Sequence, residues 1–163
     1  MKKTIKLLLF LLFTAFSFSQ APLEKNRLQL NAGFGFSSWS NPIFIGIDYG
    51  INDVVTIGGE VSYQSYKNYD ITSVIIGIQA NGNYHFNKLF VIPSQWDFYA
   101  GLNVNYYIWT IKDSDNSFVD DKPFGLGAQI GGRYFFNDKI AINLEFGGGN
   151  ATSGGKIGVT YKF

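Results

Sequence analysis

The sequence contains no cysteine, one histidine, one methionine and only four prolines among its 163 residues. The absence of cysteine excludes disulfide bonds, thiolate metal sites, cysteine nucleophiles and an N-terminal lipid anchor attached to cysteine. Charged residues are also scarce at 15%, whereas ordinary soluble domains carry about 25%. The formal net charge is only +1, so the composition gives no indication of a nucleic-acid partner.

Glycine and aromatic residues are abundant by contrast. The chain has 19 glycines, and 18% of its residues are Phe, Tyr or Trp. Few charges combined with many aromatic and glycine residues are typical of a protein whose outer surface contacts lipid.

The beginning of the chain has the layout of a secretory signal peptide. Three lysines within the first six residues precede an apolar run over residues 7–16, and Ser17 and Ser19 place small side chains where a signal peptidase cuts. The apolar run is shorter than the ~20 residues that a membrane-spanning helix needs. We therefore predict a cleaved signal peptide at residues 1–19, Sec-type export, and one mature domain at residues 20–163.

Beyond residue 26 the dominant pattern is an alternation of polar and apolar residues, typical of strands with two different faces. Several of the segments are about ten residues long, enough for a tilted strand to cross the hydrocarbon layer. Their even number suits closure of an antiparallel barrel. The predicted fold is all-β, an eight-stranded antiparallel up-and-down transmembrane β-barrel. The eight predicted strands, of which the second and eighth are shorter, cover residues 27–37, 43–49, 55–64, 74–86, 96–109, 124–136, 140–147 and 156–163.

The two faces of these strands differ in content. One face is apolar, whereas the other carries glycines, amides and all the strand charges. Glycine on a water-exposed face would weaken a strand without packing anything. Inside a narrow barrel it leaves space for large inward side chains such as Tyr99, Tyr107, Phe135 and Arg133. We therefore predict that the polar face lines the lumen and that the apolar face contacts lipid. The predicted inward charges are Arg27, Asp48, Glu60, Asp97, Arg133, Glu145, Lys156 and Lys162.

Aromatic residues gather toward the two ends of the predicted strands. Such clustering is typical of the girdles that mark membrane interfaces. A smaller set lies toward the end away from the chain termini. The predicted girdle at the end that carries the termini consists of Tyr49, Tyr84, Phe86, Trp96, Phe98, Tyr134, Phe136, Tyr161 and Phe163.

Three inward charges form the candidate site in the lumen. If residue 136 pairs with residue 140, then Arg133 lies opposite Asn143 and Glu145 lies one inward step along the strand. We predict a structural ion network of Glu60, Arg133 and Glu145, because a buried arginine needs carboxylate partners. An alternative is that this network gates a narrow channel. An eight-stranded interior is normally filled by side chains, which favours a plug.

Other candidate chemistry is weak. His85 is the only histidine, and Asp97 on the next strand is placed to orient it, but no matching serine is evident. The loop at residues 113–121 holds four carboxylates, yet it lacks the glycine and closing glutamate of a calcium-binding loop. We predict no catalytic residue, no cofactor and no metal ligand, and interpret the loop as a solvated surface segment.

A resemblance to a known group of proteins rests on residues 83–86, 96–102, 132–136, 144–147 and 158–163. These segments resemble the outer-membrane β-barrel domain proteins common in Bacteroidetes. More distantly, the chain is similar to barrels of the OmpX and OmpA transmembrane-domain type. The resemblance implies an outer-membrane location, and Phe163 matches the C-terminal signal that barrel-assembly machinery recognises in such families. The peptidoglycan-binding domain of OmpA has no counterpart here.

The function predicted from these observations is that of a small, non-enzymatic, integral outer-membrane barrel with a structural or surface-interaction role through its loops. Its expected surroundings are outer-membrane lipid and lipopolysaccharide, and we expect a monomer. Two alternatives stay open at this point. One is an outer-membrane enzyme that modifies lipid A; the other is a secreted, soluble, lipocalin-like carrier, which would need an apolar interior. The sequence names no ligand and no physiological process.

Overall fold

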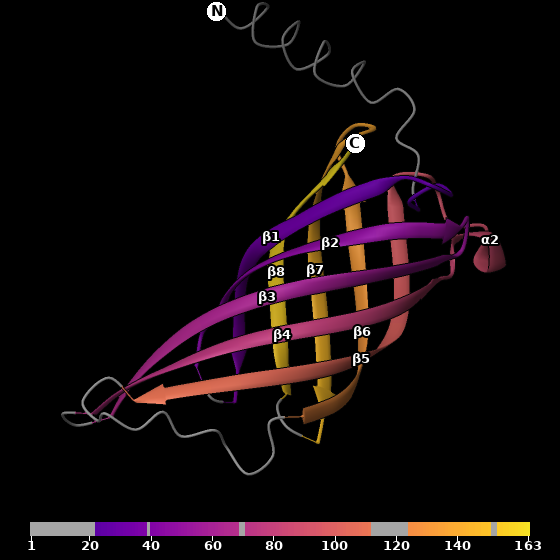
Figure 1. Ribbon diagram of the computed structural model, residues 1–163. Helices are drawn as coiled ribbons and strands as arrows, with labels where there is room; N and C mark the ends of the chain where they lie inside the picture. Colours follow the sequence, from indigo (N-terminus) through magenta and orange to yellow (C-terminus); the bar gives the residue numbers. More distant parts are fainter. Residues whose placement is uncertain (1–21, 39, 69–70, 112–123, 151–152) are drawn as a thin grey trace, which may run out of the picture.

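The computed structural model forms one closed barrel in which every strand pairs with the next and β8 pairs with β1 (Figure 1). The predicted signal peptide and the acidic loop at residues 113–121 lie outside the described residues, so the predictions about them stay predictions. The structure describes residues 22–38, 40–68, 71–111, 124–150 and 153–163, without the side chains of residues 66–68, 71 and 111.

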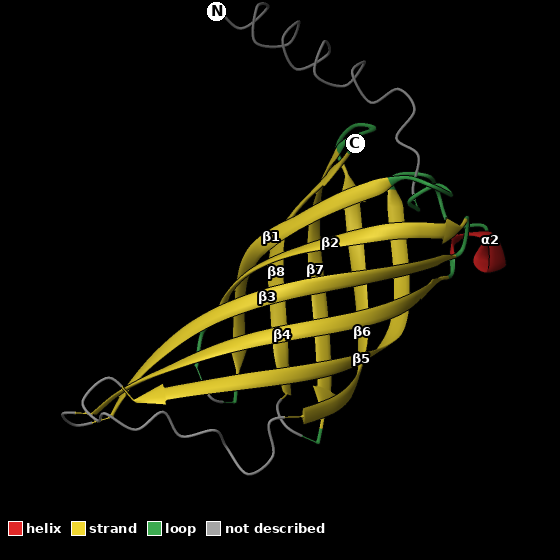
Figure 2. Cartoon of the chain, in the orientation of Figure 1, coloured by secondary structure: helices red, strands yellow, loops and turns green. Residues whose placement is uncertain are grey.

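All eight predicted strands are present and all pair antiparallel (Figure 2). The eight-stranded antiparallel up-and-down fold predicted from the alternation is confirmed. The strands are β1 (Leu28–Ser37), β2 (Ile43–Asn52), β3 (Val55–Asn68), β4 (Ile71–His85), β5 (Trp96–Ile111), β6 (Phe124–Phe135), β7 (Ile140–Gly149) and β8 (Ser153–Lys162).

Strand lengths differ from the prediction. The strands β2 and β8, predicted to be shorter, each have ten residues. The strands β3, β4 and β5 have 14, 15 and 16 residues, longer than their apolar alternation alone indicates. A short helix, α2 (Asn87–Phe90), lies in the connection between β4 and β5. Among the described residues, no helix is long and apolar enough to cross a membrane.

The two faces of the sheet have the predicted orientation, except that Arg27, predicted to point inward, lies before β1 and is exposed. Large apolar side chains point outward and are exposed, for example Phe34, Leu102 and Leu126 at 68%, 73% and 63%. Charged side chains such as Asp97 and Arg133 point inward and are buried. A soluble lipocalin-like carrier has the reverse arrangement, so that alternative is wrong.

Glycines provide the space for large inward side chains, as predicted. Gly131 pairs with Tyr99 across β5 and β6, and a Cβ atom at Gly131 would lie 2.4 Å from the Tyr99 ring. Gly77 pairs with Tyr107 in the same way, and its Cβ would lie 3.2 Å from that ring. The glycine positions therefore allow bulky residues to fill a narrow lumen.

The barrel has two unlike ends. The terminal end carries residues 22–27 and Phe163, and the distal end is the opposite one. The ladder between β2 and β3 stops distally at Ile43 and Tyr63, and the ladder between β5 and β6 stops at Tyr106 and Phe124. Beyond these pairs β3, β4 and β5 continue as a three-stranded sheet, which projects past the other strands in Figure 1.

Candidate functional site in the lumen

The terminal end of the lumen is closed by the segment that precedes β1. Leu23 in this segment is only 1% exposed, and the backbone N–H of Asn26 donates to the carbonyl oxygen of Gly50 at 2.8 Å. The Lys162 Nζ atom lies 3.4 Å from the carbonyl oxygen of Pro22 and 4.0 Å from the centroid of the Phe135 ring. These contacts fix the segment against the terminal end of the barrel.

The next layer is the arginine cluster, formed by Arg133, Asp48 and Asp97. The guanidinium donates to Asp97 Oδ2 and to Asp48 Oδ2, each at 3.0 Å. Asp48 also accepts hydrogen bonds from the side-chain amides of Gln29 at 2.8 Å and Asn31 at 2.9 Å. All five side chains are buried. The desolvated cation is thus matched by two carboxylates with further donors, as a buried ion pair requires.

His85 extends the arginine cluster toward β3. Its Nδ1 atom lies 2.6 Å from Asp97 Oδ1, which confirms the predicted contact, and its Nε2 atom lies 3.0 Å from the hydroxyl of Thr56. This order of acid, imidazole and hydroxyl resembles a hydrolytic triad. However, the three residues are at most 1% exposed, and none lines a described cavity. The Thr56 hydroxyl is therefore not accessible to a substrate in this structure.

A second ion cluster lies nearer the distal end and is called here the lysine cluster. Lys156 Nζ lies 2.9 Å from both carboxylate oxygens of Glu60 and 2.8 Å from Glu145 Oε1. The hydroxyl of Tyr99 donates to Glu145 Oε2 at 2.8 Å. The same Tyr99 ring lies 4.3 Å below the guanidinium carbon of Arg133. Tyr99 therefore lies between the two ion clusters and contacts both.

The predicted network of Glu60, Arg133 and Glu145 is wrong in its pairing. All three residues point into the lumen, and Arg133 lies opposite Asn143 as predicted. However, Arg133 pairs with Asp48 and Asp97, whereas Glu60 and Glu145 pair with Lys156. The level of each side chain along the lumen depends on the strand stagger of the closed barrel. Alternation gives the face of a residue and not this level, so the sequence did not reveal the true partners.

Amide side chains form a hydrogen-bonded ladder on the other wall of the lumen. Asn105 donates to Asn103 at 2.7 Å, and Asn103 donates to Gln129 at 2.8 Å. Gln129 in turn donates to Asn83 at 2.8 Å and accepts from Gln79 at 3.4 Å. The alternation of polar and apolar residues predicts that the asparagines point inward, but it does not predict this ladder. Its signal is the recurrence of Asn and Gln at inward positions of β4, β5 and β6.

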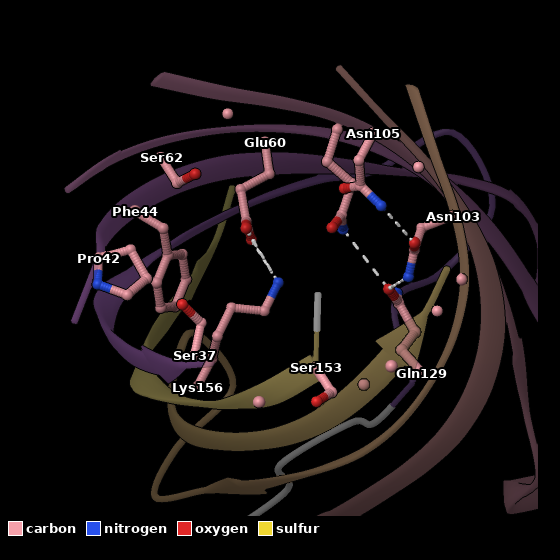
Figure 3. A pocket seen from close by; sticks show the side chains of 18 of the residues that line it. Ser37, Pro42, Phe44, Glu60, Ser62, Asn103, Asn105, Gln129, Ser153 and Lys156 are labelled. Carbon is pink, nitrogen blue, oxygen red and sulfur yellow. Dashed lines mark hydrogen bonds and ion pairs between the residues drawn. The ribbon is translucent and has the colours of Figure 1, made fainter. Parts of the chain in front are cut away.

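The distal cavity lies between the lysine cluster and the amide ladder (Figure 3). Its volume is about 110 Å³, and its lining reaches Ser37 and Ser153 at the distal ends of β1 and β8. A second void of about 20 Å³ lies deeper, beside Arg133 and Tyr99, and has room for about one water molecule. A pocket of about 460 Å³ lies at the terminal rim, bordered by Leu23, Lys139 and Lys162. Between this rim pocket and the distal cavity, the lumen is nearly filled.

The predicted aromatic girdle lies on the outer face at the terminal end. Its rings contact one another in pairs: Trp96 stacks on Phe98 at 5.5 Å between centroids and also contacts Tyr134 at 4.8 Å. Tyr161 and Phe163 make an edge contact at 5.3 Å. The geometry fits an interfacial belt, and its contact with lipid stays a prediction. The further ring contacts within this group join Tyr84 to Phe86 and Tyr134 to Phe136.

The connections at the terminal end of the barrel carry an exposed ion pair between Lys88 in α2 and Asp53 in the turn from β2 to β3. Lys88 Nζ lies 2.7 Å from Asp53 Oδ2, and this hydrogen bond lowers the pKa of the Asp53 carboxyl below its ordinary value. Among the described residues, no group of three His, Cys, Asp or Glu side chains is arranged to hold a metal ion. The acidic loop at residues 113–121 is not among those residues.

Comparison with known proteins identifies the family. Residues 8–163 match the model of the outer membrane protein beta-barrel domain, beginning within the predicted signal peptide. No curated protein matches the chain. Among solved structures, Neisserial surface protein A superposes with a TM-score of 0.63 at 18% identity, covering 84% of this chain and 96% of that one.

Two barrels of Pseudomonas aeruginosa are also similar. OprG gives a TM-score of 0.60 at 12% identity and covers 89% of this chain and 99% of its own. The N-terminal barrel domain of OprF gives 0.59 at 16% identity, with coverage of 85% and 98%. At these identities the structural similarity shows the fold alone. Together with the match over nearly the whole chain, the closed barrel and its apolar outer face show that this chain belongs to the outer membrane β-barrel domain family and is a small integral protein of the outer membrane.

Proposed function

We propose that this protein is a non-enzymatic outer-membrane barrel that binds a macromolecular partner at the cell surface through its distal end. The even number of strands places both ends of the barrel chain on one side of the membrane. In barrels of this kind the turns on the periplasmic side are short and the outer loops longer. We assign the terminal end to the periplasm, because the chain reaches the membrane from that side after export, and the distal end to the exterior.

The observation that carries the proposal is the three-stranded sheet that continues beyond the barrel. Over residues 64–68, β3 pairs with β4 but has no strand partner on its other edge within the described residues. An exposed strand edge is a template for an added strand from another chain. Residue 65 already accepts one hydrogen bond at this edge, from the Ser40 hydroxyl at 3.1 Å, which leaves most of the edge for a partner.

The filled terminal half of the lumen supports binding over transport. A solute would have to displace the buried arginine cluster and the segment around Leu23 to reach the periplasm. We expect no ion conductance from the protein in planar bilayers. Stepwise single-channel currents from the wild-type protein would contradict this part of the proposal and would favour the gate alternative.

Lipid, lipopolysaccharide and the assembly machinery are the other proposed partners. The outward rings of the girdle suit the membrane interface. Phe163 is 58% exposed, so its ring is accessible to the machinery that recognises a terminal aromatic residue. The closed barrel has no strand edge within the membrane layer, which supports a monomer.

A lipid A-modifying activity is the second candidate function. Only the contacts among Thr56, His85 and Asp97 favour it, and these residues are buried at the terminal end. The test is mass spectrometry of lipid A from cells that produce the wild-type protein or His85→Ala. We expect identical spectra. A modification present with the wild-type protein and absent with the variant would establish an enzyme.

The proposed surface interaction is tested by site-specific photocrosslinking on intact cells. A photoreactive residue at position 65 should capture a partner that the same residue at lipid-facing position 126 does not. Replacing residues 66–73 with an Asn-Gly turn keeps the pair of Ser65 and Val74 but removes the projecting hairpin, so the adduct should disappear. A matched control replaces the terminal turn at residues 137–139 in the same way and should retain the adduct. Identical capture from positions 65 and 126 would refute the proposal.

A further inference from the structure

The distal cavity has two walls of different chemistry. On one side lies the ion pair of Lys156 and Glu60, and on the other lie Asn105, Asn103 and Gln129, with open space between them (Figure 3). Phe44 is buried beside the ion pair, with Lys156 Nζ 5.3 Å from the centroid of its ring. The cavity is thus a polar cleft with two walls of different polar chemistry.

The charges in this cavity are already matched to each other. Lys156 Nζ contacts Glu60 and Glu145, and the second oxygen of Glu145 accepts from Tyr99. The cluster carries a formal charge of −1, which disfavours an anionic ligand. A cationic ligand would compete with Lys156 for the same carboxylate oxygens, so the lining favours a neutral ligand.

The amide wall offers both donors and acceptors to such a ligand. Asn105 uses one amide hydrogen on Asn103, and Gln79 uses one on Gln129. Within the described contacts, each therefore retains a second amide hydrogen and a carbonyl oxygen. Carboxylate oxygens keep further acceptor sites for hydroxyl donors. This mixture matches groups that donate and accept at once, which is the property of a hydroxyl.

The size of the cavity limits the ligand to about one sugar ring. A single buried water needs roughly 10–15 Å³ of such space, so 110 Å³ corresponds to several waters. One hexose, with its six-membered ring and hydroxyls, displaces a comparable set of water molecules. Inward glycines at positions 127 and 147 line the cavity and let a ring approach the backbone.

We propose that the distal cavity binds one neutral hexopyranose unit, free or at the end of a surface glycan. The amide wall and the carboxylates bind its hydroxyls. The site is open toward the exterior and closed toward the periplasm, so it binds without transporting. This inference is independent of the β3 edge and of the partner proposed for it.

The test is an NMR titration of the full mature protein in nanodiscs. The probes are the methyl glycosides of glucose, galactose, mannose and N-acetylglucosamine, with glycine, butylammonium and inorganic phosphate as charged comparators. We expect at least one glycoside to shift the side-chain amide signals of Gln79, Asn103 and Gln129, and no comparator to do so. Shifts from a charged comparator alone, or from no probe at all, would overturn the proposal.

Two variants locate the binding. Asn105→Leu removes one amide of the wall and should weaken binding about tenfold, the effect of a lost hydrogen bond in a largely desolvated site. Ser62→Leu places a larger side chain in the cavity and should abolish binding. Asn81→Leu is the matched control, because Asn81 lies on the same strand as Gln79 but lines the deeper void. It should leave affinity unchanged.

Slower migration after boiling than before confirms that each variant is folded. A glycoside affinity that persists in folded Ser62→Leu would place the binding outside the cavity and would refute the proposal. An equal loss of glycoside affinity in Asn105→Leu and Asn81→Leu would mean that the amide wall does not contact the ligand. This result would also refute the proposal.

Discussion

The two halves of the lumen are built from the same kinds of residue but differ in packing. In the terminal half, Arg133 and its two aspartates are buried, and the segment around Leu23 closes the end. In the distal half, Lys156 and its two glutamates border a cavity of about 110 Å³. Each half therefore contains one cation between two carboxylates. The difference is the space beside them.

Because of this difference, we expect the terminal half of the lumen to contribute mainly to stability and the distal half to be accessible to a ligand. Charges without room for water depend entirely on their partners, so the terminal half should tolerate little change. Charges beside a cavity large enough for water keep part of their solvation, so the distal half should tolerate more. The comparison predicts where substitutions are costly and where the surface is left for binding.

Removing the central cation of the terminal half should have the largest effect. Arg133→Met leaves Asp48 and Asp97 without their cation in an interior with room for only about one water, and should cost about 3–5 kcal/mol. Adding Asp48→Asn and Asp97→Asn should recover much of the loss, because no unpaired charge remains. The measurement is the free energy of unfolding in detergent or lipid, taken from denaturant titration.

The matching change in the distal half sharpens the comparison. Lys156→Met leaves Glu60 and Glu145 beside the cavity and should cost about 1–3 kcal/mol, the range for an unsatisfied polar group. If Lys156→Met proved as costly as Arg133→Met, the two halves would not differ in solvation as proposed.

A charge on the lipid side tests the separation of the two faces. Leu102→Arg should cost about 2–4 kcal/mol near the middle of the bilayer. Asn103→Asp, one residue away and facing the lumen, should cost less because polar neighbours surround it. The free energies of unfolding of the two variants in lipid vesicles provide the measurement. Equal sensitivity at both positions would contradict the assignment of the faces.

Added volume should distinguish the filled half from the hollow one. Gly131→Ala places a Cβ atom 2.4 Å from the Tyr99 ring and should cost about 1–3 kcal/mol through overpacking. Gly147→Ala meets its nearest atom, a backbone oxygen, at 3.2 Å and borders the cavity, so its cost should be smaller. Thermal unfolding of both variants in the same detergent measures the difference, and the opposite order would place the tight packing elsewhere.

The exposed pair of Asp53 and Lys88 should have the smallest effect. Because the hydrogen bond from Lys88 lowers the folded-state pKa of Asp53 below the ordinary 3.8, its contribution is fully present above that value. It is lost as the pH falls through the lowered pKa. Asp53→Asn should therefore leave the unfolding midpoint at neutral pH nearly unchanged and remove a small acid-dependent component. A large loss at neutral pH would contradict this expectation.

The sequence predicted the eight strands and their two faces because both follow from local alternation. A residue such as Leu102 faces lipid and its neighbour Asn103 faces the lumen whatever the rest of the chain does. The sequence did not predict the full length of β3, β4 and β5. Polar residues near their distal ends carry no lipid-facing signal, and pairing with one another extends the strands there.

The candidate site was predicted only in part, since Arg133, Glu60 and Glu145 were placed in the lumen but given the wrong partners. The sequence by itself determined which side chains point inward, because the side-chain period of a strand is two. The tertiary structure decided which of them meet, because closure fixes the tilt and stagger that set each side chain's level along the barrel. For the same reason only the closed barrel shows that Arg133 lies in a filled half, whereas Lys156 lies beside a cavity.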